Sequence, residues 1–361
     1  MKLLTELAEQ ISLLGKLKRV WFTSFNLSFE FFERHVLSTL LAMDTPRSRI
    51  DYELMQQRIN GNSSPDDSGK IDIKLFVDQR MFNANDVKRT AIDVFAINPT
   101  RIDTIHRFGE QSLFHPKVIY LEDEYGRAIL GVGSANLTLN GWSRNQEVFT
   151  FRKVASKPQI KAIQSFFLPL LKDNVLPVLA RKRWGDDKNW QFVHSFQQES
   201  FLTKLFSKTN NDSKNRLSVW SPYFPEDLTG FICKLEKKIQ SLTGNDESLI
   251  LNLIPDRVEN KYLRTKWHRK IAKWQKHGTL QFFSNPIVKH ESSDLCHAKL
   301  WLTRNRLALG SWNFTTPGSN IHLGTDAATA NIEAGIIFEN DEAFKLENKF
   351  SVDKSDFMSD D

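Results

Sequence analysis

The sequence predicts an α/β fold made of two similar halves. Strand-like and helix-like segments alternate along the 361 residues, and their order in the first half is repeated in the second. Alternation of this kind is typical of α/β proteins, and a repeated order indicates a duplicated unit. A second observation supports the duplication, because the same succession of His, Lys, Ser and Asn closes each half.

The predicted elements follow from runs of β-branched and aromatic residues, which favour strands, and from apolar residues at helical spacing. In the first half they are a strand at 19–26, a helix at 29–41, a strand at 71–77, a helical stretch around 83–91 and strand-like residues 114–121. In the second half they are a strand at 217–224, a helix at 228–242, a strand at 248–254, a helix at 261–277 and strand-like residues 296–302.

The division of the chain follows from the repeat and from its polar segments. We expect an N-terminal half at 1–180 with the first motif and a C-terminal half at 181–340 with the second. The remaining residues, 341–361, are acidic and polar at their end, and we expect a flexible tail there.

Composition narrows the class of protein. Hydrophobic residues make up 40% and charged residues 25%, which is ordinary for a globular protein in solution. The apolar runs are too short to span a bilayer, the N-terminus lacks the apolar centre of a signal peptide, and the two cysteines form no disulfide framework. We therefore expect a cytoplasmic location and no stable membrane association. The net charge of +6 is compatible with a polyanionic partner.

The candidate catalytic residues form the motif His-x-Lys, then Gly-Ser-x-Asn, then Glu, which occurs once in each half. Its members are His115, Lys117, Ser134, Asn136 and Glu147 in the first half, and His297, Lys299, Ser311, Asn313 and Glu333 in the second. A single His-x-Lys carries little information, whereas two complete copies in matching contexts point to one composite site.

The spacing within each motif predicts how its side chains lie. Residues two apart on a strand project from the same face, so each His lies beside its Lys and each Ser beside its Asn. Turns at 124–126 and 304–305 would fold each motif into a hairpin. We expect the two hairpins to meet across a pseudo-twofold axis, with both imidazoles facing one phosphorus atom.

This set of side chains suits phosphoryl transfer without a metal ion. One neutral imidazole can attack phosphorus, and a second, protonated imidazole can donate to the leaving oxygen. The Lys and Asn side chains can hold the nonbridging oxygens, and Glu147 and Glu333 can accept from the far ring nitrogen of each His. The other histidines show no metal-ligand spacing. We therefore expect neither a metal nor another cofactor.

The doubled motif resembles that of the phospholipase D superfamily, whose signature is His-x-Lys followed by Gly-Ser-x-Asn, present twice. The familiar signature has an Asp where this sequence has Glu122 and Arg304. The nuclease-like and tyrosyl-DNA phosphodiesterase branches also lack that Asp, and the run from Ser134 to Thr138 is similar to the corresponding stretch of the latter.

The resemblance implies two phospholipase D-like α/β halves, each a mixed sheet flanked by helices, related by pseudo-twofold symmetry. It implies a phosphohistidine intermediate, with His115 as the nucleophile and His297 as the general acid. Because both motifs lie in one chain, a monomer should suffice for one active site. Small nucleases of this superfamily often serve in bacterial restriction or phage defence, sometimes beside a helicase partner.

Two basic segments are candidates for contacts with the phosphate backbone of a nucleic acid. In the predicted helix 261–277 the basic residues lie around an apolar stripe: Arg264, Lys266, Arg269, Lys270 and Lys273. The second segment is Arg181, Lys182 and Arg183. A packed amphipathic helix with a solvated basic face is the alternative for the first segment, and the pattern favours it over a phosphate-contact surface.

Several substrates fit the motif. A nuclease that hydrolyses DNA, or else RNA, fits the basic chain and the missing Asp best. A repair phosphodiesterase that removes an adduct from a DNA end would use the same residues. A phospholipase or phospholipid synthase is a third alternative, and a nucleic-acid-binding module without catalysis is a fourth.

Overall fold

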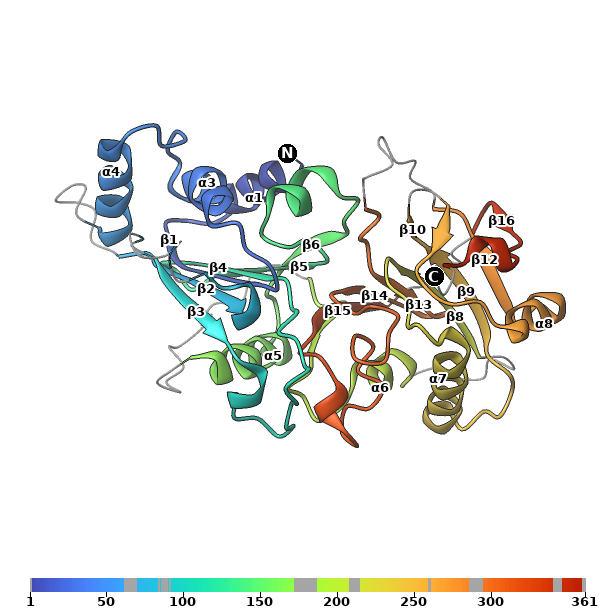
Figure 1. The fold of residues 1–361 in the computed structure, drawn as a ribbon. Helices are drawn as coiled ribbons and strands as arrows, with labels where there is room; N and C mark the ends of the chain where they lie inside the picture. Colours follow the sequence, from blue (N-terminus) through green and yellow to red (C-terminus); the bar gives the residue numbers. More distant parts are fainter. Residues whose placement is uncertain are drawn as a thin grey trace.

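The computed structural model describes residues 2–61, 70–83, 85, 90, 92–171, 187–207, 215–258, 261–285, 295–339 and 346–358. These residues form two large mixed sheets, one in each half of the chain, and helices flank both sheets (Figure 1). The α/β fold with two similar halves is thereby confirmed. None of the described helices has the length and apolar character needed to cross a membrane.

The first sheet has the strand order β3-β2-β1-β4-β5-β6. Strands β1 to β3 are parallel, and β4 to β6 are antiparallel. The strands are β1 (Leu17–Ser24), β2 (Asp72–Asp78), β3 (Asp93–Ile97), β4 (Val118–Asp123), β5 (Ala128–Gly133) and β6 (Phe149–Lys153). The helices of this half are α1 (Lys2–Ser12), α2 (Phe29–Phe31), the π-helix η1 (Phe32–Leu37), α3 (Ser38–Leu41), α4 (Arg49–Asn60) and α5 (Lys157–Phe167).

Side-chain alternation along β1 explains why helices cover both faces of this sheet. Val20 and Phe22 pack in one core with α1 and the helical residues 29–41, whereas Trp21 packs in another core with Phe166 of α5. The predicted helix at 29–41 is therefore present, with a π-helical middle. The helical stretch predicted around 83–91 lies largely outside the described residues.

The second sheet has the order β16-β12-β9-β8-β13-β14-β15-β7. Its strands are β7 (Trp190–His194), β8 (Arg216–Ser221), β9 (Ile250–Pro255), β12 (Leu280–Phe283), β13 (Leu300–Leu302), β14 (Arg306–Gly310), β15 (Ala334–Glu339) and β16 (Lys349–Phe350). The other elements of this half are α6 (Phe201–Phe206), α7 (Leu228–Thr243), α8 (Arg269–His277) and the short pair β10 (Arg257–Val258) and β11 (Tyr262–Leu263).

The registers of the two sheets show that the repeat in the sequence is a repeat in space. Ser24 at the end of β1 lies beside Val77 of β2, and Ser221 at the end of β8 lies beside Pro255 of β9. In each sheet the first parallel strand also pairs with an antiparallel hairpin, β4–β5 or β13–β14. Strands β1, β2, β4 and β5 thus correspond to β8, β9, β13 and β14.

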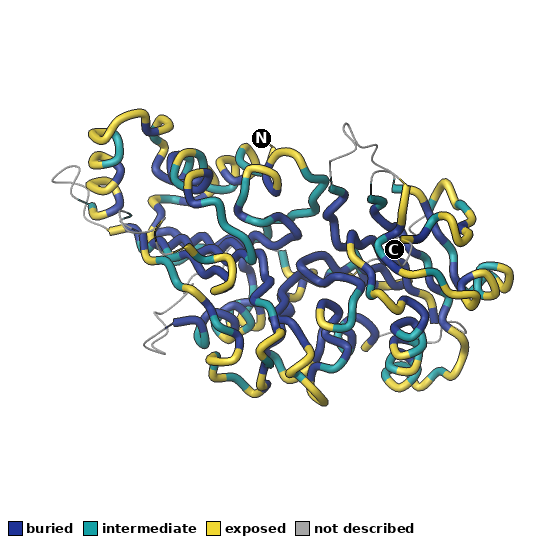
Figure 2. Tube along the Cα trace, viewed as in Figure 1, coloured by how far each residue is buried: buried dark blue, intermediate teal, exposed yellow. Residues whose placement is uncertain are grey.

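The halves meet at two parallel bridges and share a core. Phe114 bridges Ile332, and Gln146 bridges Cys296. One hydrophobic cluster contains Phe166 of α5 together with Ile336 of β15. Figure 2 accordingly shows buried residues from the first sheet through the middle of the molecule to the second sheet.

The helix predicted at 261–277 is shorter than expected. Only Arg269–His277 is helical (α8), and Tyr262–Leu263 instead pairs with Arg257–Val258. His268 has an extended backbone, and its side chain accepts from the N–H of Lys270, so it caps the helix. The apolar residues before His268 were at helical spacing by coincidence, because Leu263 belongs to a strand.

The segment expected as a flexible tail is packed over 346–358. Lys349–Phe350 pairs with β12, and Val352 and Phe357 are buried. The ring of Phe357 lies 5.0 Å from that of Trp267. The acidic residues of this segment lie between these apolar contacts.

Candidate active site

The motif residues lie where the two halves meet, directly before and after the strands of the hairpins. His115 and Lys117 precede β4, and the backbone N–H of Gly133 donates to the carbonyl of Lys117, which closes the first hairpin. His297 and Lys299 precede β13 in the same way. The N–H of each His donates across to the other half, His115 to the carbonyl of Ile332 and His297 to that of Gln146.

Each imidazole is oriented by a carboxylate of the opposite half. Nδ1 of His115 lies 2.9 Å from Oε2 and 3.1 Å from Oε1 of Glu333. Nδ1 of His297 lies 2.9 Å from both carboxylate oxygens of Glu147. The bridges that precede these residues by one position explain the crossing, because each brings a His of one half beside a Glu of the other. This arrangement leaves Nε2 of each ring for chemistry.

The two serines of the motif hold the glutamate segments. Ser134 Oγ donates to Oε2 of Glu147 at 2.5 Å, and Ser311 Oγ bonds the backbone of Ala334, the residue after Glu333. Both serines are fully buried. The serines therefore hold the glutamates in place, and the glutamates in turn orient the imidazoles.

The two lysines are buried beside the imidazoles. Lys117 Nζ donates to the carbonyl of His115 at 2.6 Å. Lys299 Nζ donates to the carbonyl of His297 at 2.8 Å and lies 2.9 Å from Nε2 of the same ring. An ammonium group held this close to the ring can balance the negative charge of a phosphate group bound beside it.

The two asparagines differ in their partners. The backbone N–H of Asn26 donates to Oδ1 of Asn136 at 3.3 Å, which leaves the Nδ2 donors of Asn136 for a ligand. Oδ1 of Asn313 is buried and has no hydrogen-bond partner among the described residues. The site is therefore less symmetric than the motif.

Burial dominates the pKa values of the basic groups. It lowers the pKa of His115 well below its usual range, and the nearby charges of Lys117 and Lys299 add to this. It lowers the pKa of His297 to about 4 and that of Lys299 to about 8. The pKa of Lys117 is also well below its usual range, again because of burial. Both imidazoles are thus favoured in the neutral form at neutral pH.

The two orienting carboxyl groups differ in pKa. Burial raises the pKa of Glu333 to about 8 against the opposing effect of Lys117. Burial also acts to raise the pKa of Glu147, but the charge of His297 and its hydrogen bond outweigh it, so the pKa of Glu147 is lowered. Glu147 is therefore the more readily ionised partner, and His297 the better placed ring to carry a positive charge.

A pair of serines at the strand ends was missed by the sequence reasoning. Ser24 Oγ accepts from the N–H of Leu137, and Ser221 Oγ accepts from the N–H of Phe314. Each bond fixes the backbone directly after a motif Asn. The signal was available, because both residues lie near the end of the first strand predicted for their half, at 19–26 and 217–224.

A pair of buried aspartates was also missed. Asp78 Oδ2 accepts from the N–H of Phe114 at 2.7 Å, and Asp256 Oδ1 accepts from the N–H of Cys296 at 3.2 Å. Both carboxylates therefore hold the residue directly before a motif His. The register places them at equivalent positions, one after Val77 and Pro255. Alignment of the two second strands would have revealed them.

The predicted nucleic-acid contacts do not form one helical face. Arg269, Lys270 and Lys273 are exposed on α8, which packs beside β12 at the outer end of the second sheet (Figure 1). Lys266 lies before the helix and pairs with Glu226. Arg264 lies closer to the motif, 3.6 Å from Asp256. Arg181, Lys182 and Arg183 lie outside the described residues.

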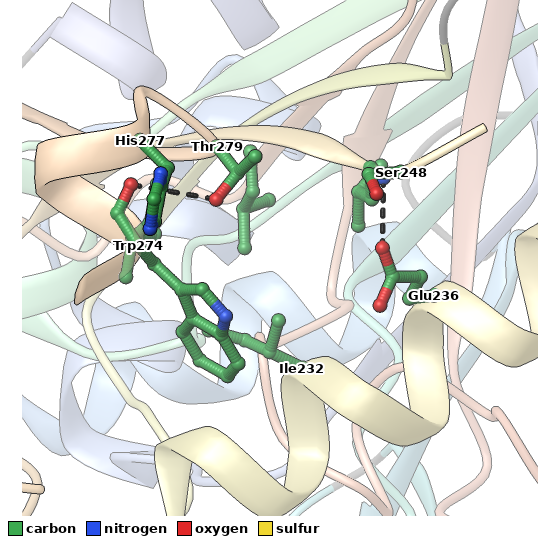
Figure 3. Close-up of a pocket in the computed structure, with 9 residues that line it drawn as sticks. Ile232, Glu236, Ser248, Trp274, His277 and Thr279 are labelled. Carbon is green, nitrogen blue, oxygen red and sulfur yellow. Dashed lines mark hydrogen bonds between the residues drawn. The ribbon is translucent and has the colours of Figure 1, made fainter. Parts of the chain in front are cut away.

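A separate cavity of about 210 Å³ lies between α7, α8 and the second sheet. Ile232 and Glu236 of α7 face Trp274 and His277 of α8 across it (Figure 3). Oε1 of Glu236 accepts from the N–H of Leu249. The cavity contains none of the motif residues. Among the described residues, no group of three or more His, Cys, Asp or Glu side chains could hold a metal ion.

Comparison of the chain with protein-family models and with curated proteins gives no match. Solved structures do match. Yeast tyrosyl-DNA phosphodiesterase is 12% identical, with 91% of this chain and 86% of that chain covered and a TM-score of 0.53. Phosphatidylserine synthase from Haemophilus influenzae is 13% identical, with 94% and 81% covered and a TM-score of 0.52. The chain therefore shares its fold with these two solved structures.

Proposed function

We propose that this chain is a phosphodiesterase of the phospholipase D type that hydrolyses nucleic acid, DNA in preference to RNA, without a metal ion. The crossed pairs His115–Glu333 and His297–Glu147 carry the proposal. Two oriented imidazoles and two buried ammonium groups are the parts that a metal-free in-line displacement at phosphorus requires.

The reaction has two steps. Nε2 of His115 forms a bond to phosphorus while the bond from phosphorus to the leaving oxygen breaks, and that oxygen takes a proton from Nε2 of His297. Water then attacks phosphorus and gives a proton to His297, and the bond from phosphorus to nitrogen breaks. Glu333 stabilises the charge on His115, and Glu147 stabilises the imidazolium of His297.

The protonation of His297 depends on the substrate. Burial and Lys299 disfavour the charged ring and lower its pKa to about 4. A bound phosphodiester brings a negative charge, which favours the imidazolium.

Nucleic acid is favoured as the substrate by charge. The chain carries a net charge of +6, and Arg269, Lys270 and Lys273 are exposed on α8. Neutralisation of phosphates by such side chains is the main source of affinity for nucleic acid. The similar yeast structure is that of a tyrosyl-DNA phosphodiesterase.

The test is an assay of the purified chain in EDTA against labelled single-stranded DNA, duplex DNA, RNA and phospholipid vesicles. We expect cleavage of DNA, and a loss of at least about 1,000-fold in His115→Ala and in His297→Ala. If the chain hydrolyses only the phospholipid of the vesicles, the proposal is wrong and the chain is a lipid enzyme. Tight binding of DNA without hydrolysis of any diester would replace it by a binding module.

A DNA-end repair phosphodiesterase is the second candidate, because the fold is similar to that of the yeast tyrosyl-DNA phosphodiesterase. An oligonucleotide with a 3′-phosphotyrosyl end distinguishes the two. Removal of tyrosine without internal cleavage supports the repair enzyme, and internal cleavage supports the nuclease. The role in restriction or phage defence, with a helicase partner, is tested by phage plating on cells that express the chain.

A further inference from the structure

Tyr223 is an exposed aromatic residue at the edge of the candidate site. It follows the end of β8 by two positions and is 38% exposed. Its ring stands against the imidazole of His297 at 6.1 Å between centroids and 82° between planes. A large ring left open to solvent beside a catalytic imidazole is available for contact with a substrate.

Arg264 lies against the same ring. Its guanidinium carbon is 5.6 Å from the centroid of Tyr223, and one nitrogen is 3.6 Å from Oδ2 of the buried Asp256. Asp256 also accepts from the N–H of Cys296, the neighbour of His297. The tyrosine, the arginine and the imidazole are therefore held by one scaffold, and the Arg264 side chain remains one-third exposed.

The equivalent region of the first half is less open, because the ring of Phe25, 5.5 Å from that of His115, is only partly exposed and its neighbouring cation is the buried Lys117. The position that corresponds to Tyr223 is Asn26, because the carbonyls of Asn26 and Tyr223 accept from the equivalent hydroxyls of Ser24 and Ser221. The N–H of Asn26 is bonded to Asn136. Among the described residues, the second half thus presents the more exposed ring together with a partly exposed cation, and the buried Oδ1 of Asn313, which has no hydrogen-bond partner among them, lies in the same half.

We infer that Tyr223 and Arg264 form a nucleotide-binding subsite beside His297. The exposed part of the Tyr223 ring stacks on the base next to the cleaved phosphodiester, and Arg264 contacts the adjoining phosphate. Aromatic rings bind bases in single strands in this way, without sequence preference, and arginine suits phosphate oxygens. The inference rests on the proposed function and adds that the substrate strand is unpaired at this position.

The test uses single-stranded oligonucleotides with one native phosphodiester in a phosphorothioate backbone. In one set the nucleotide beside the native bond keeps its base, and in the other it is abasic. For the unmodified chain we expect KM to rise about tenfold when the base is absent. In Tyr223→Leu the two sets should have the same KM, and Tyr223→Phe should restore the difference. In Arg264→Gln, KM should rise for both sets, with a weaker dependence on salt.

Tyr125→Leu is the matched control. Tyr125 is 61% exposed and lies under Arg127, whose partner is the buried Asp123, but it belongs to the turn between β4 and β5. This variant should keep the preference for the intact base. A preference that persists in Tyr223→Leu would overturn the subsite alone. Failure of the unmodified chain to cleave any oligonucleotide, with hydrolysis of bis(4-nitrophenyl) phosphate, would overturn the proposed function and the subsite with it.

Discussion

Glu333 Oε2 lies 2.9 Å from Nδ1 of His115, although 218 residues separate the two along the chain. The equivalent pair, Glu147 and His297, crosses in the opposite direction. Each imidazole therefore depends on the other half for its orientation. A defect in the glutamate of one half should appear in the chemistry of the other.

Glu333→Gln tests this dependence. The amide is neutral at every pH and can turn its N–H₂ toward Nδ1, so unlike the glutamate it cannot become the anion that balances the positive charge developing on His115. We expect kcat to fall about 10- to 100-fold, the usual cost of a hydrogen bond to a charged group. Addition of Glu333→Gln to His115→Ala should cause no further loss, because the two residues act as a unit. A full additional loss in the double variant would contradict the pairing.

The pH dependence of the rate should report Lys299. Its pKa is lowered to about 8 by burial, so the ammonium loses its proton as the pH rises through that value. The neutral amine cannot balance the charge of the phosphoryl group, and kcat/KM should therefore fall above about pH 8. Because the pKa of Glu333 is also about 8, the control is Glu333→Gln, which should keep this alkaline limb. A rate that stays constant to pH 10 would rule out the role of Lys299.

Asp78→Asn should lower turnover without weakening substrate binding. The carboxylate accepts from the N–H groups of Phe114 and Arg80 and so fixes the backbone before His115. In the asparagine, the N–H₂ group would face one of these N–H groups, and two donors cannot form a hydrogen bond. We expect kcat to fall about tenfold with KM nearly unchanged. Asp93→Asn, at the exposed start of β3, is the control and should have no effect. A change confined to KM would instead place Asp78 in contact with the substrate.

Gly335→Ala should destabilise the fold. A Cβ at this position would collide with the ring of Trp312, which is itself stacked on Phe201 at 4.0 Å between centroids. Overpacking of this kind costs about 1–3 kcal/mol of the free energy of unfolding. Urea denaturation measures the change. When Gly335→Ala is combined with Trp312→Leu, which makes room for the methyl group, the loss of stability should be smaller than the sum of the two single losses. An unchanged denaturation midpoint in Gly335→Ala would show instead that the Trp312 ring can move.

Local patterns predicted the elements that carry the motif. The His-x-Lys spacing and the turn at 124–126 were sufficient to place His115 opposite the end of β5. The position of the turn and the buried face of the strands together fix the register of a hairpin. The order of strands and helices likewise predicted both halves.

The crossing of the His and Glu partners could not be read from the sequence. Pairing of His115 with Glu147 or with Glu333 fits the same spacing, and only the meeting of the two halves decides between them. The helix at 261–277 failed for a similar reason. Leu263 shows helical spacing with Ile271, but its backbone pairs with Arg257, a contact that periodicity does not reveal.

The hydrophobic cluster that joins Phe166 to Ile336 gives the molecule one more property. Because both residues belong to one cluster, cleavage of the chain between residues 171 and 187 would expose apolar surface on both fragments. Such fragments should aggregate when made singly and recover activity when made together. We therefore expect the chain to unfold in one cooperative transition, despite its internal duplication.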